Sequence, residues 1–598
     1  MVAAVVTFVV LITTYLGTAA PDLTVWDAAE LATAANTLGI PHPPGTPLWV
    51  LLGRVATLLF SSAGPARSVT LLSVWCAAAA GGLGALMASR WIGARGAVAG
   101  AVGAGTMMSV WASATETEVY SAAMLLAVAM LSAGERAGRQ EISDNARARW
   151  RALVVFLAAL AVPLHLSALV ALPAAIAFAW RGARPTARDA LSWLALAALG
   201  LSAIAVLPLR AAEVPLLNSG NPISLDALWS LLRREQYAVA GLWPRTAPLW
   251  LQLGNVFEWA DWQVAFGLNP NPGPSFARTT LSVLWAWLAL LGARALWRHE
   301  ARVGRAMTLL LLSATMGVAL WLNLKAGPSY GVGLLPDGAV HEARERDYFF
   351  ALGFWTWGLM AGAGMASIAT RLARHVPKAL APVALSLAAV PLLANATVMD
   401  RSREPVSSLP RVYARLLLDA VPSGGVLLTA GDNDSFPLWY LQQVEDYRTD
   451  VTVVTVPLLG ADWYRAELIS RAKLLTETEA AGSSLPQLLA SIASQAIAGR
   501  RAIRVSALLS RVDRNLIDPT AGWALEGLVY APSALLQAGT IGLDLPRLIE
   551  ARERVAPTML RALPPGTDAG GHQLQQLLRC TQVARLEDPL LVSACGGA

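Results

Sequence analysis

Two carboxylates lie three residues apart in the segment that follows the first apolar run of the chain. The segment reads TVWDAAELATAANTLGIPHPPGTPLW and contains Asp27 and Glu30. On a helix that begins near Trp26, the two side chains share one face. The proline-rich part is rigid, because proline fixes its own φ and restricts its predecessor. A carboxylate held this way suits general-base chemistry. The alternative is that Asp27 caps the helix and Glu30 completes its first turn.

Two further charged clusters lie next to long apolar runs. Glu116 and Glu118 belong to ATETEVY, and Glu118 leads directly into an apolar run, where an ionised group is usually functional or paired. Arg344 and Arg346 alternate with carboxylates in HEARERDYFF, and a guanidinium can donate two parallel hydrogen bonds to phosphate. The ordinary alternatives are a solvated loop for the glutamates and an ion-paired interfacial anchor for the arginines.

The histidines and cysteines carry less information. His42 and His165 stand alone in apolar segments, where a histidine is more often packed and hydrogen-bonded than a ligand. No spacing of His, Cys or carboxylates is typical of a metal site, so we expect no required metal. Three cysteines are too few for a disulfide scaffold. In an oxidising compartment, Cys580 and Cys595 could pair.

The composition indicates a membrane protein. Of 598 residues, 55% are hydrophobic and 14% are charged, against about 25% charged in soluble domains. The net charge of +6 lies mostly in short breaks between apolar runs, which indicates membrane topology rather than nucleic-acid binding. We predict eleven membrane helices. They lie at 1–20, 68–88, 97–114, 117–133, 151–163, 166–180, 190–208, 279–297, 306–323, 347–370 and 379–396.

The apolar run at 46–62 decides the topology. If it spans the membrane, the basic loops are divided between the two faces. If it lies at the interface, within a first outer loop at 21–67, all of them share one face, which the positive-inside rule places in the cytoplasm. We expect the second arrangement. The basic loops are 90–95, 136–151, 181–188, 298–305 and 371–378; the outer face receives 21–67, 114–118, 209–278, 324–346 and everything after 397.

After Asn395 the pattern changes to that of an α/β domain. Apolar runs shorten to a strand at 426–429, a helix at 435–443 and a strand at 451–456. The loop AGDNDSFP follows the first strand, at the position that usually faces a ligand in an α/β unit. The alternative is a structural turn rich in Gly, Asp and Asn. We therefore predict a transmembrane domain at 1–397 and an extracytoplasmic α/β domain at 398–598.

Several segments together resemble one protein family. They are WDAAEL…TLGIPHPPGTPL, ATETEVY, LPLRA…PLLNSGNP…REQY, ERDYF and AGDNDSFPLWYLQ, in order from about residue 10 to 470. The family was long known only as a domain of unknown function. It has many bacterial members and an animal endoplasmic-reticulum protein O-mannosyltransferase that modifies plexin-type receptors. The first motif departs from the family's usual form, with Ala-Ala instead of Ser-Gly between Asp27 and Glu30.

The resemblance implies a GT-C glycosyltransferase fold, with a sugar donor carried by a polyprenyl phosphate and no required cofactor. In that fold an acidic residue of the first outer loop is catalytic, which assigns Asp27 as the base, with Glu30 beside it. Residues implied to hold the donor and its phosphate are Arg210, Arg344, Arg346, Glu118 and His42. The expected reaction is inverting transfer of a sugar, mannose in the animal relative, to a hydroxyl of a protein or an envelope glycan. The expected location is the bacterial inner membrane, crossed several times.

Two other classes remain open. An envelope assembly protein without catalysis would use the domain at 398–598 to bind a partner. A transporter or flippase for lipid-linked sugars would show paired repeats or charges at mid-span, and the sequence shows neither. Substitution of Asp27 separates these classes, because an enzyme loses transfer whereas a scaffold keeps working.

Overall fold

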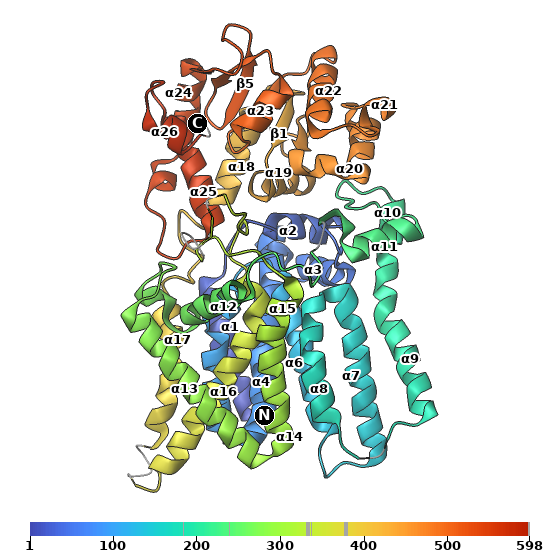
Figure 1. Ribbon diagram of the computed structural model, residues 1–598, viewed down its shortest axis with the longest axis vertical. Coiled ribbons are helices and arrows are strands. Elements are labelled where there is room, and N and C mark those ends of the chain that lie inside the picture. Colours follow the sequence, from blue (N-terminus) through green and yellow to red (C-terminus); the bar gives the residue numbers. More distant parts are fainter. Residues whose placement is uncertain (183, 238–239, 331–334, 337, 376–380, 596–598) are drawn as a thin grey trace.

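The computed structural model describes residues 1–182, 184–237, 240–330, 335–336, 338–375 and 381–595 (Figure 1). A bundle of long helices occupies one end of the molecule, and an α/β domain built from the C-terminal third occupies the other (Figure 1). Loops and short helices lie between the two (Figure 1). The protein is therefore a multi-pass helical membrane protein with a C-terminal domain that contains a mixed sheet.

Helices occupy all eleven predicted apolar runs where the structure describes them. They are α1 (Val2–Thr18), α4 (Pro65–Gly105), α5 (Met108–Ala114), α6 (Val119–Ala137), α7 (Asp144–Leu164), α8 (Leu172–Ala179), α9 (Ala187–Leu201), α10 (Val206–Ala212), α13 (Phe276–His299), α14 (Ala301–Leu312), α15 (Val318–Leu322), α16 (Ala351–Leu372) and α17 (Ala389–Asn395). Short 3₁₀ or π segments join several of them.

The number of helices long and apolar enough to cross a membrane is smaller than eleven. In the described residues, five pass by length and composition, or six if α5 and α6, bent by 111°, form one span. Several of the others, such as α1 and the segment Val383–Asn395, are apolar but shorter than 18 residues. Residues 376–378 of the basic loop at 371–378, and the first two residues of the run at 379–396, lie outside the described residues.

The helix α4 contains the predicted run at 68–88 and the first part of the run at 97–114, which continues into α5. Gly93, at φ 71° and ψ 165°, interrupts its helical backbone. Gly81 and Gly105, on opposite sides of this break, both lie against Leu11 of α1. The parts of α4 before and after Gly93 therefore lie side by side along α1, as the separate predicted runs at 68–88 and 97–114 require. Gly100 of the second part contacts Gly362 of α16, and such small residues let membrane helices approach closely.

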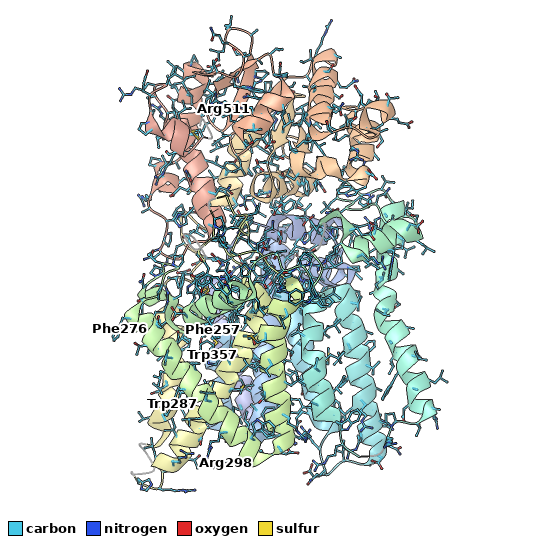
Figure 2. The ribbon with its side chains drawn as sticks, in the orientation of Figure 1. Phe257, Phe276, Trp287, Arg298, Trp357 and Arg511 are labelled. Atoms are coloured by element: carbon cyan, nitrogen blue, oxygen red, sulfur yellow. A yellow bond between two sulfur atoms is a disulfide. The ribbon has the colours of Figure 1, made fainter. Side chains whose placement is uncertain are left out.

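The outer surface of the bundle is apolar. Phe276 and Trp287 of α13 point away from the bundle, whereas Trp357 of α16 lies within it (Figure 2). Phe276 is 91% exposed and Trp357 only 9%. A large exposed apolar surface marks contact with a membrane or a partner. Here it covers helices of membrane-spanning length, so we assign it to lipid contact.

The basic loops gather at one end of the bundle. Arg302 donates to the carbonyl oxygens of Glu135 and Phe178, at 3.2 and 2.8 Å. Arg181 pairs with Glu300 at 3.2 Å. These contacts join the loops at 136–151, 181–188 and 298–305. Arg298 lies at the end of the bundle remote from the C-terminal domain (Figure 2).

This arrangement predicts opposite labelling of two exposed arginine positions. Arg298→Cys should be protected from a membrane-impermeant maleimide in intact cells, and Arg511→Cys in the C-terminal domain should react once the outer membrane is permeabilised. Cys76 is buried and Cys580 and Cys595 are bonded to each other, so the background is low. Labelling of position 298 without lysis would contradict a cytoplasmic location for the basic loops.

The C-terminal domain contains one six-stranded mixed sheet within the described residues. Its strands are β1 (Val426–Thr429), β2 (Thr452–Thr455), β3 (Ile503–Ser506), β4 (Gly522–Leu525), β5 (Val529–Ser533) and β6 (Ile541–Leu543), in the order β2-β1-β3-β5-β4-β6. β1 is parallel to β2 and β3, whereas β5 is antiparallel to β3 and β4. The predicted strand–helix–strand unit at 426–456 is confirmed, with Val426 paired to Thr452.

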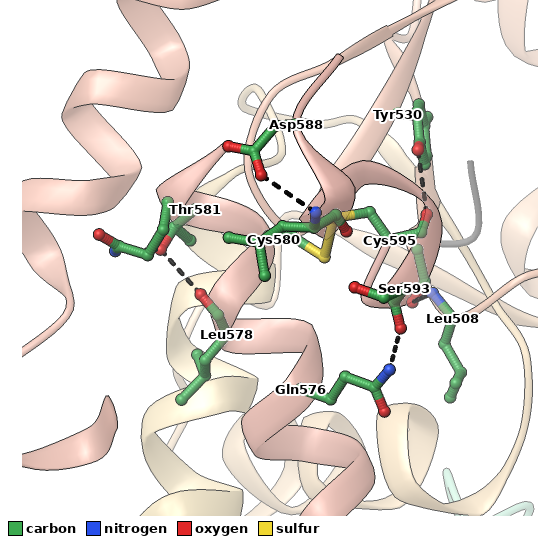
Figure 3. Close-up of a disulfide and its surroundings, with 12 residues drawn as sticks. Leu508, Tyr530, Gln576, Leu578, Cys580, Thr581, Asp588, Ser593 and Cys595 are labelled. Carbon is green, nitrogen blue, oxygen red and sulfur yellow. Dashed lines mark hydrogen bonds between the residues drawn. A yellow bond between two sulfur atoms is a disulfide. The ribbon is translucent and has the colours of Figure 1, made fainter. Parts of the chain in front are cut away.

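Helices cover the sheet of the C-terminal domain. They are α18 (Leu409–Asp419), α19 (Asp432–Val444), α20 (Asp462–Glu467), α21 (Glu477–Ala480), α22 (Leu485–Ala498), α23 (Arg511–Ile517), α24 (Leu545–Arg554), α25 (Ala569–Leu578) and α26 (Pro589–Ser593). Near the C-terminus, Cys580 and Cys595 form the expected disulfide (Figure 3). Closing a loop of this length stabilises a fold by about 3 kcal/mol in the chain-entropy model.

Between the bundle and the sheet lie α2 (Ala28–Thr37) and α3 (Pro47–Leu59), with α11 (Leu225–Arg233) and α12 (Leu249–Ala265) at a similar level (Figure 1). The C-terminal domain holds this layer directly. Helix α19 packs on α2. The hydroxyl of Tyr440 accepts from the backbone N–H of Ala66 at 3.2 Å, and Arg411 pairs with both Asp22 and Glu445.

Candidate active site

Asp27 stands at the N-cap position of α2, but its carboxylate does not cap the helix. Within the described residues, its side chain accepts no hydrogen bond from the first turn. Its Oδ2 instead accepts from Nη2 of Arg344 at 3.1 Å. The Asp27 side chain remains 23% exposed, so a second partner can still reach it. The capping alternative is therefore not what the structure shows.

Arg344 and Arg346 form a cationic pair around one tyrosine. Nε of Arg344 and Nη1 of Arg346 both donate to the hydroxyl oxygen of Tyr348, at 3.1 and 2.6 Å. Arg346 also pairs with Glu342 at 3.1 Å. Tyr348 lies in the 3₁₀ turn Asp347–Phe350 that leads into α16. Both guanidiniums are thus fixed where a membrane helix begins, and Arg344 also contacts Asp27.

The buried Glu30 and the partly exposed His42 form an ion pair that fixes the proline-rich segment. Glu30 is 1% exposed, and its Oε1 accepts from the backbone N–H of His42 at 2.8 Å. Its Oε2 pairs with Nδ1 of His42. Burial opposes protonation of His42, but Glu30 raises its pKa, with help from Asp27 and Asp432, to about 10. Glu30 therefore holds its own loop together, and His42 contributes a positive charge near Asp27.

The pKa values of Asp27 and Glu118 are displaced in opposite directions. Burial by itself would raise the pKa of Asp27, but the charges of Arg344, His42 and Arg346 outweigh burial and hold this pKa below its ordinary value. Burial raises the pKa of Glu118 to about 8, because Arg344 offsets only part of the burial and Asp27 adds to it. At neutral pH Asp27 is ionised and most of Glu118 is protonated. Such divergence within one site is typical of an acid and a base with different tasks.

Arg210 lies apart from this pair. Arg210 donates to the carbonyl oxygens of Leu38 and Thr37, at 2.8 and 3.4 Å, and so binds the C-terminal end of α2. A ten-residue helix is about 15 Å long, which separates Arg210 from Asp27 at the opposite end. His165 shares a hydrogen bond of 2.7 Å with Ser167. Its ring packs on Tyr120, at 5.0 Å between centroids.

The C-terminal domain contributes residues that we did not assign to the site from sequence. The backbone N–H of Trp26 donates to Oδ1 of Asn433 at 2.8 Å, and its indole Nε1 donates to Oδ1 of Asp568 at 2.6 Å. Arg344 lies over the indole ring, 5.1 Å from its centroid. Desolvation of the Asp432 carboxyl raises its pKa to about 6, and the charges of Asp27 and Glu30 add to the shift. The AGDNDSFP motif pointed to Asp432 and Asn433, whereas no sequence signal marked Asp568.

Two segments of the chain match known family profiles. Residues 27–186 match the profile described as the N-terminal domain of the protein O-mannosyl-transferase TMEM260. Residues 410–479 match TMEM260-associated domain 2. The first segment contains Asp27, Glu30, His42 and Glu118, and the second contains Asp432 and Asn433. No curated protein sequence matches the chain.

Three solved structures resemble the chain at low sequence identity. ArnT from Cupriavidus metallidurans bound to undecaprenyl phosphate has a TM-score of 0.46 and 12% identity, and covers 78% of this chain and 94% of its own. Its apo state has a TM-score of 0.45 and 14% identity, with the same coverage. The oligosaccharyltransferase of Archaeoglobus fulgidus, in complex with Zn and sulfate, has a TM-score of 0.43 and 11% identity, and covers 89% of this chain and 73% of its own. In the two segments 27–186 and 410–479, this chain is similar to domains of the TMEM260 protein O-mannosyl-transferase family.

Proposed function

We propose that this protein is a membrane glycosyltransferase that moves a sugar from a polyprenyl phosphate to a hydroxyl acceptor. The observation that carries the proposal is the ionised, partly exposed Asp27 in contact with Arg344, beside Arg346. The profile match places Asp27 at the first residue of the segment related to a protein O-mannosyltransferase. That relationship favours mannose as the sugar and a Ser or Thr of a protein as the acceptor.

The reaction needs one base and a site for a phosphate leaving group. Asp27 takes the proton of the acceptor hydroxyl, whose oxygen forms a new bond to C1 of the sugar. The bond between C1 and the phosphate oxygen breaks, and its electron pair stays on the polyprenyl phosphate, with inversion at C1. Arg344 and Arg346 are suited to neutralise that phosphate, because guanidinium groups match its geometry bidentately. These two side chains supply the positive charge that this scheme needs at the phosphate.

Glu118 has a separate task in this scheme. An ionised carboxylate would repel the phosphate, whereas a protonated one can donate a hydrogen bond to the donor. Glu118→Gln should keep most of the transfer activity, and Glu118→Ala should lose about 10- to 100-fold, the range for a hydrogen bond to a charged group. The wild type should lose activity as the pH rises through about 8, where Glu118 ionises, and Glu118→Gln should lack that alkaline limb. Equal profiles for wild type and Glu118→Gln would contradict this role.

The proposed function is tested by intact-glycan mass spectrometry of envelope proteins and lipids. Cells with the protein should carry a hexose-type modification that deleted cells lack, and a plasmid copy should restore it. A copy with Asp27→Asn should not restore it, whereas Asp226→Asn, an exposed carboxylate in the first turn of α11, should. Full complementation by Asp27→Asn would favour a non-catalytic assembly protein or a flippase.

A further inference from the structure

Trp26, which precedes the proposed base, has an unusual backbone conformation. Its φ is +61°, in the left-handed region that bulky side chains rarely adopt. Such a conformation costs free energy and persists only where the surroundings impose it. Because Asp27 is the next residue, the backbone of Trp26 decides where the carboxylate of Asp27 points. The groups that hold Trp26 therefore also position Asp27.

Those groups belong to the C-terminal domain and lie more than 400 residues away. Asn433 is 3% exposed and accepts the backbone N–H of Trp26 through its Oδ1. Its Nδ2 donates to Gln573 at 3.1 Å, which orients the amide so that its oxygen faces Trp26. Asp568 accepts from the indole of Trp26 and, at 2.7 Å, from the N–H of Gly570 in the first turn of α25. Helices α19 and α25 thus each place one acceptor on Trp26.

A purely structural turn does not explain why Asn433 is there. The turn in AGDNDSFP is closed by Asp434, whose carboxylate accepts from the backbone N–H groups of Ala430 and Gly431 at 2.9 to 3.1 Å. Asp434 is fully buried. The two residues therefore have different contacts. Asp434 caps α19 within the domain, whereas Asn433 bonds to Trp26 outside it.

We propose that Asn433 and Asp568 are positioning residues, through which the C-terminal domain completes the active site by holding Trp26 and thereby Asp27. This inference rests on the proposed function. Asn433 and Asp568 touch neither donor nor acceptor in this scheme; they set the direction of Asp27 and the face on which Arg344 packs. In this proposal, sugar transfer requires the C-terminal domain as well as the membrane bundle.

The first experiment compares Asn433→Ala with a matched control, Gln576→Ala, in the full-length protein. The control removes a side-chain amide of α25 that donates to the carbonyl oxygen of Ser593 and has no described contact with Asn433 or Trp26. With radiolabelled undecaprenyl phosphate mannose as probe and the acceptors of its own membranes, Asn433→Ala should lower kcat at least 10-fold. This loss of kcat is expected because misplacing a catalytic group by about 1 Å costs on the order of 10²-fold in rate. The KM for the donor should change less than 2-fold. Asn433→Asp should restore most of kcat, because its carboxylate oxygen still accepts from Trp26.

Hydrogen exchange gives a readout that does not depend on sugar transfer. The segment at 23–28 should exchange at least 10-fold faster in Asn433→Ala than in Gln576→Ala, while β1 and β2 keep their protection. Trp26→Phe removes the indole donor and keeps an aromatic ring, a smaller one, at this position. Its effect on kcat should not add to that of Asp568→Ala, although Asp568→Ala also weakens α25.

The outcomes separate the two proposals. If Asn433→Ala matches Gln576→Ala in both exchange and kcat, the positioning role is wrong. If the effects of Trp26→Phe and Asp568→Ala on kcat are additive, the contact between the Trp26 indole and Asp568 does not contribute to positioning Asp27. If the wild type transfers no mannose from this donor, the donor assignment in the proposed function fails, and faster exchange at 23–28 in Asn433→Ala alone still supports the hold on Trp26.

Discussion

Replacement of Asp27 by Asn is expected to lower the rate of sugar transfer by about 10²–10⁴-fold, the range for loss of a general base. Asn keeps the size and shape of the side chain but cannot take the proton from an acceptor hydroxyl. Donor affinity should change little, because Arg344 and Arg346 keep their contacts with Tyr348. The measurement is kcat and donor KM for wild type and Asp27→Asn in proteoliposomes.

Three companion variants sharpen that result. Asp27→Glu should be partly active at best, since an extra methylene moves the carboxylate by about an ångström. Glu30→Gln should lower thermal stability more than kcat, because Glu30 is the buried partner of His42. Asp226→Asn should match the wild type. Near-normal turnover by Asp27→Asn, with loss of turnover in Glu30→Gln, would move the base to Glu30.

Replacement of Arg344 by Ala is expected to impair both donor binding and the pH dependence of transfer. Arg344 holds the pKa of Asp27 down against burial. Without it, burial is opposed only by the remaining charges, so the pKa of Asp27 rises. The base is active only when ionised, so the acidic limb of kcat/KM against pH should move to higher pH. Loss of a charge-assisted contact to phosphate should also raise the donor KM about 10- to 100-fold.

Arg344→Lys and Arg346→Ala separate these two effects. Lys restores a charge near Asp27 but not the planar fork, so Arg344→Lys should recover the acidic limb more fully than the donor KM. Arg346→Ala should weaken donor binding more than chemistry, because Arg346 pairs with Glu342 and Tyr348 and does not contact Asp27 among its described contacts. An unchanged acidic limb in Arg344→Ala would mean that Arg344 does not control the ionisation of Asp27.

Local pattern in the sequence was sufficient for much of the fold. Apolar runs of membrane length predict helices wherever they occur, because the bilayer leaves no other way to satisfy the backbone. Helices do occupy the described parts of all eleven runs. The short apolar runs at 426–456 predicted the β1–α19–β2 unit, and the spacing of Asp27 and Glu30 predicted that both lie at the start of a helix, which is α2. Each of these signals depends only on neighbours within a few residues.

Such local patterns could not predict contacts between side chains that are far apart in the sequence. Nothing local decides that Asp27 turns to Arg344 instead of capping α2, that Glu30 pairs with His42, or that Arg210 binds the far end of the same helix. The sequence alone determined the apolar helices, the α/β unit and the chemical types of the candidate residues. Only the tertiary structure decided which carboxylate stays available, because it pairs Glu30 with His42 and leaves Asp27 partly exposed beside Arg344. Burial and charge depend on contacts that form only when the whole chain has folded.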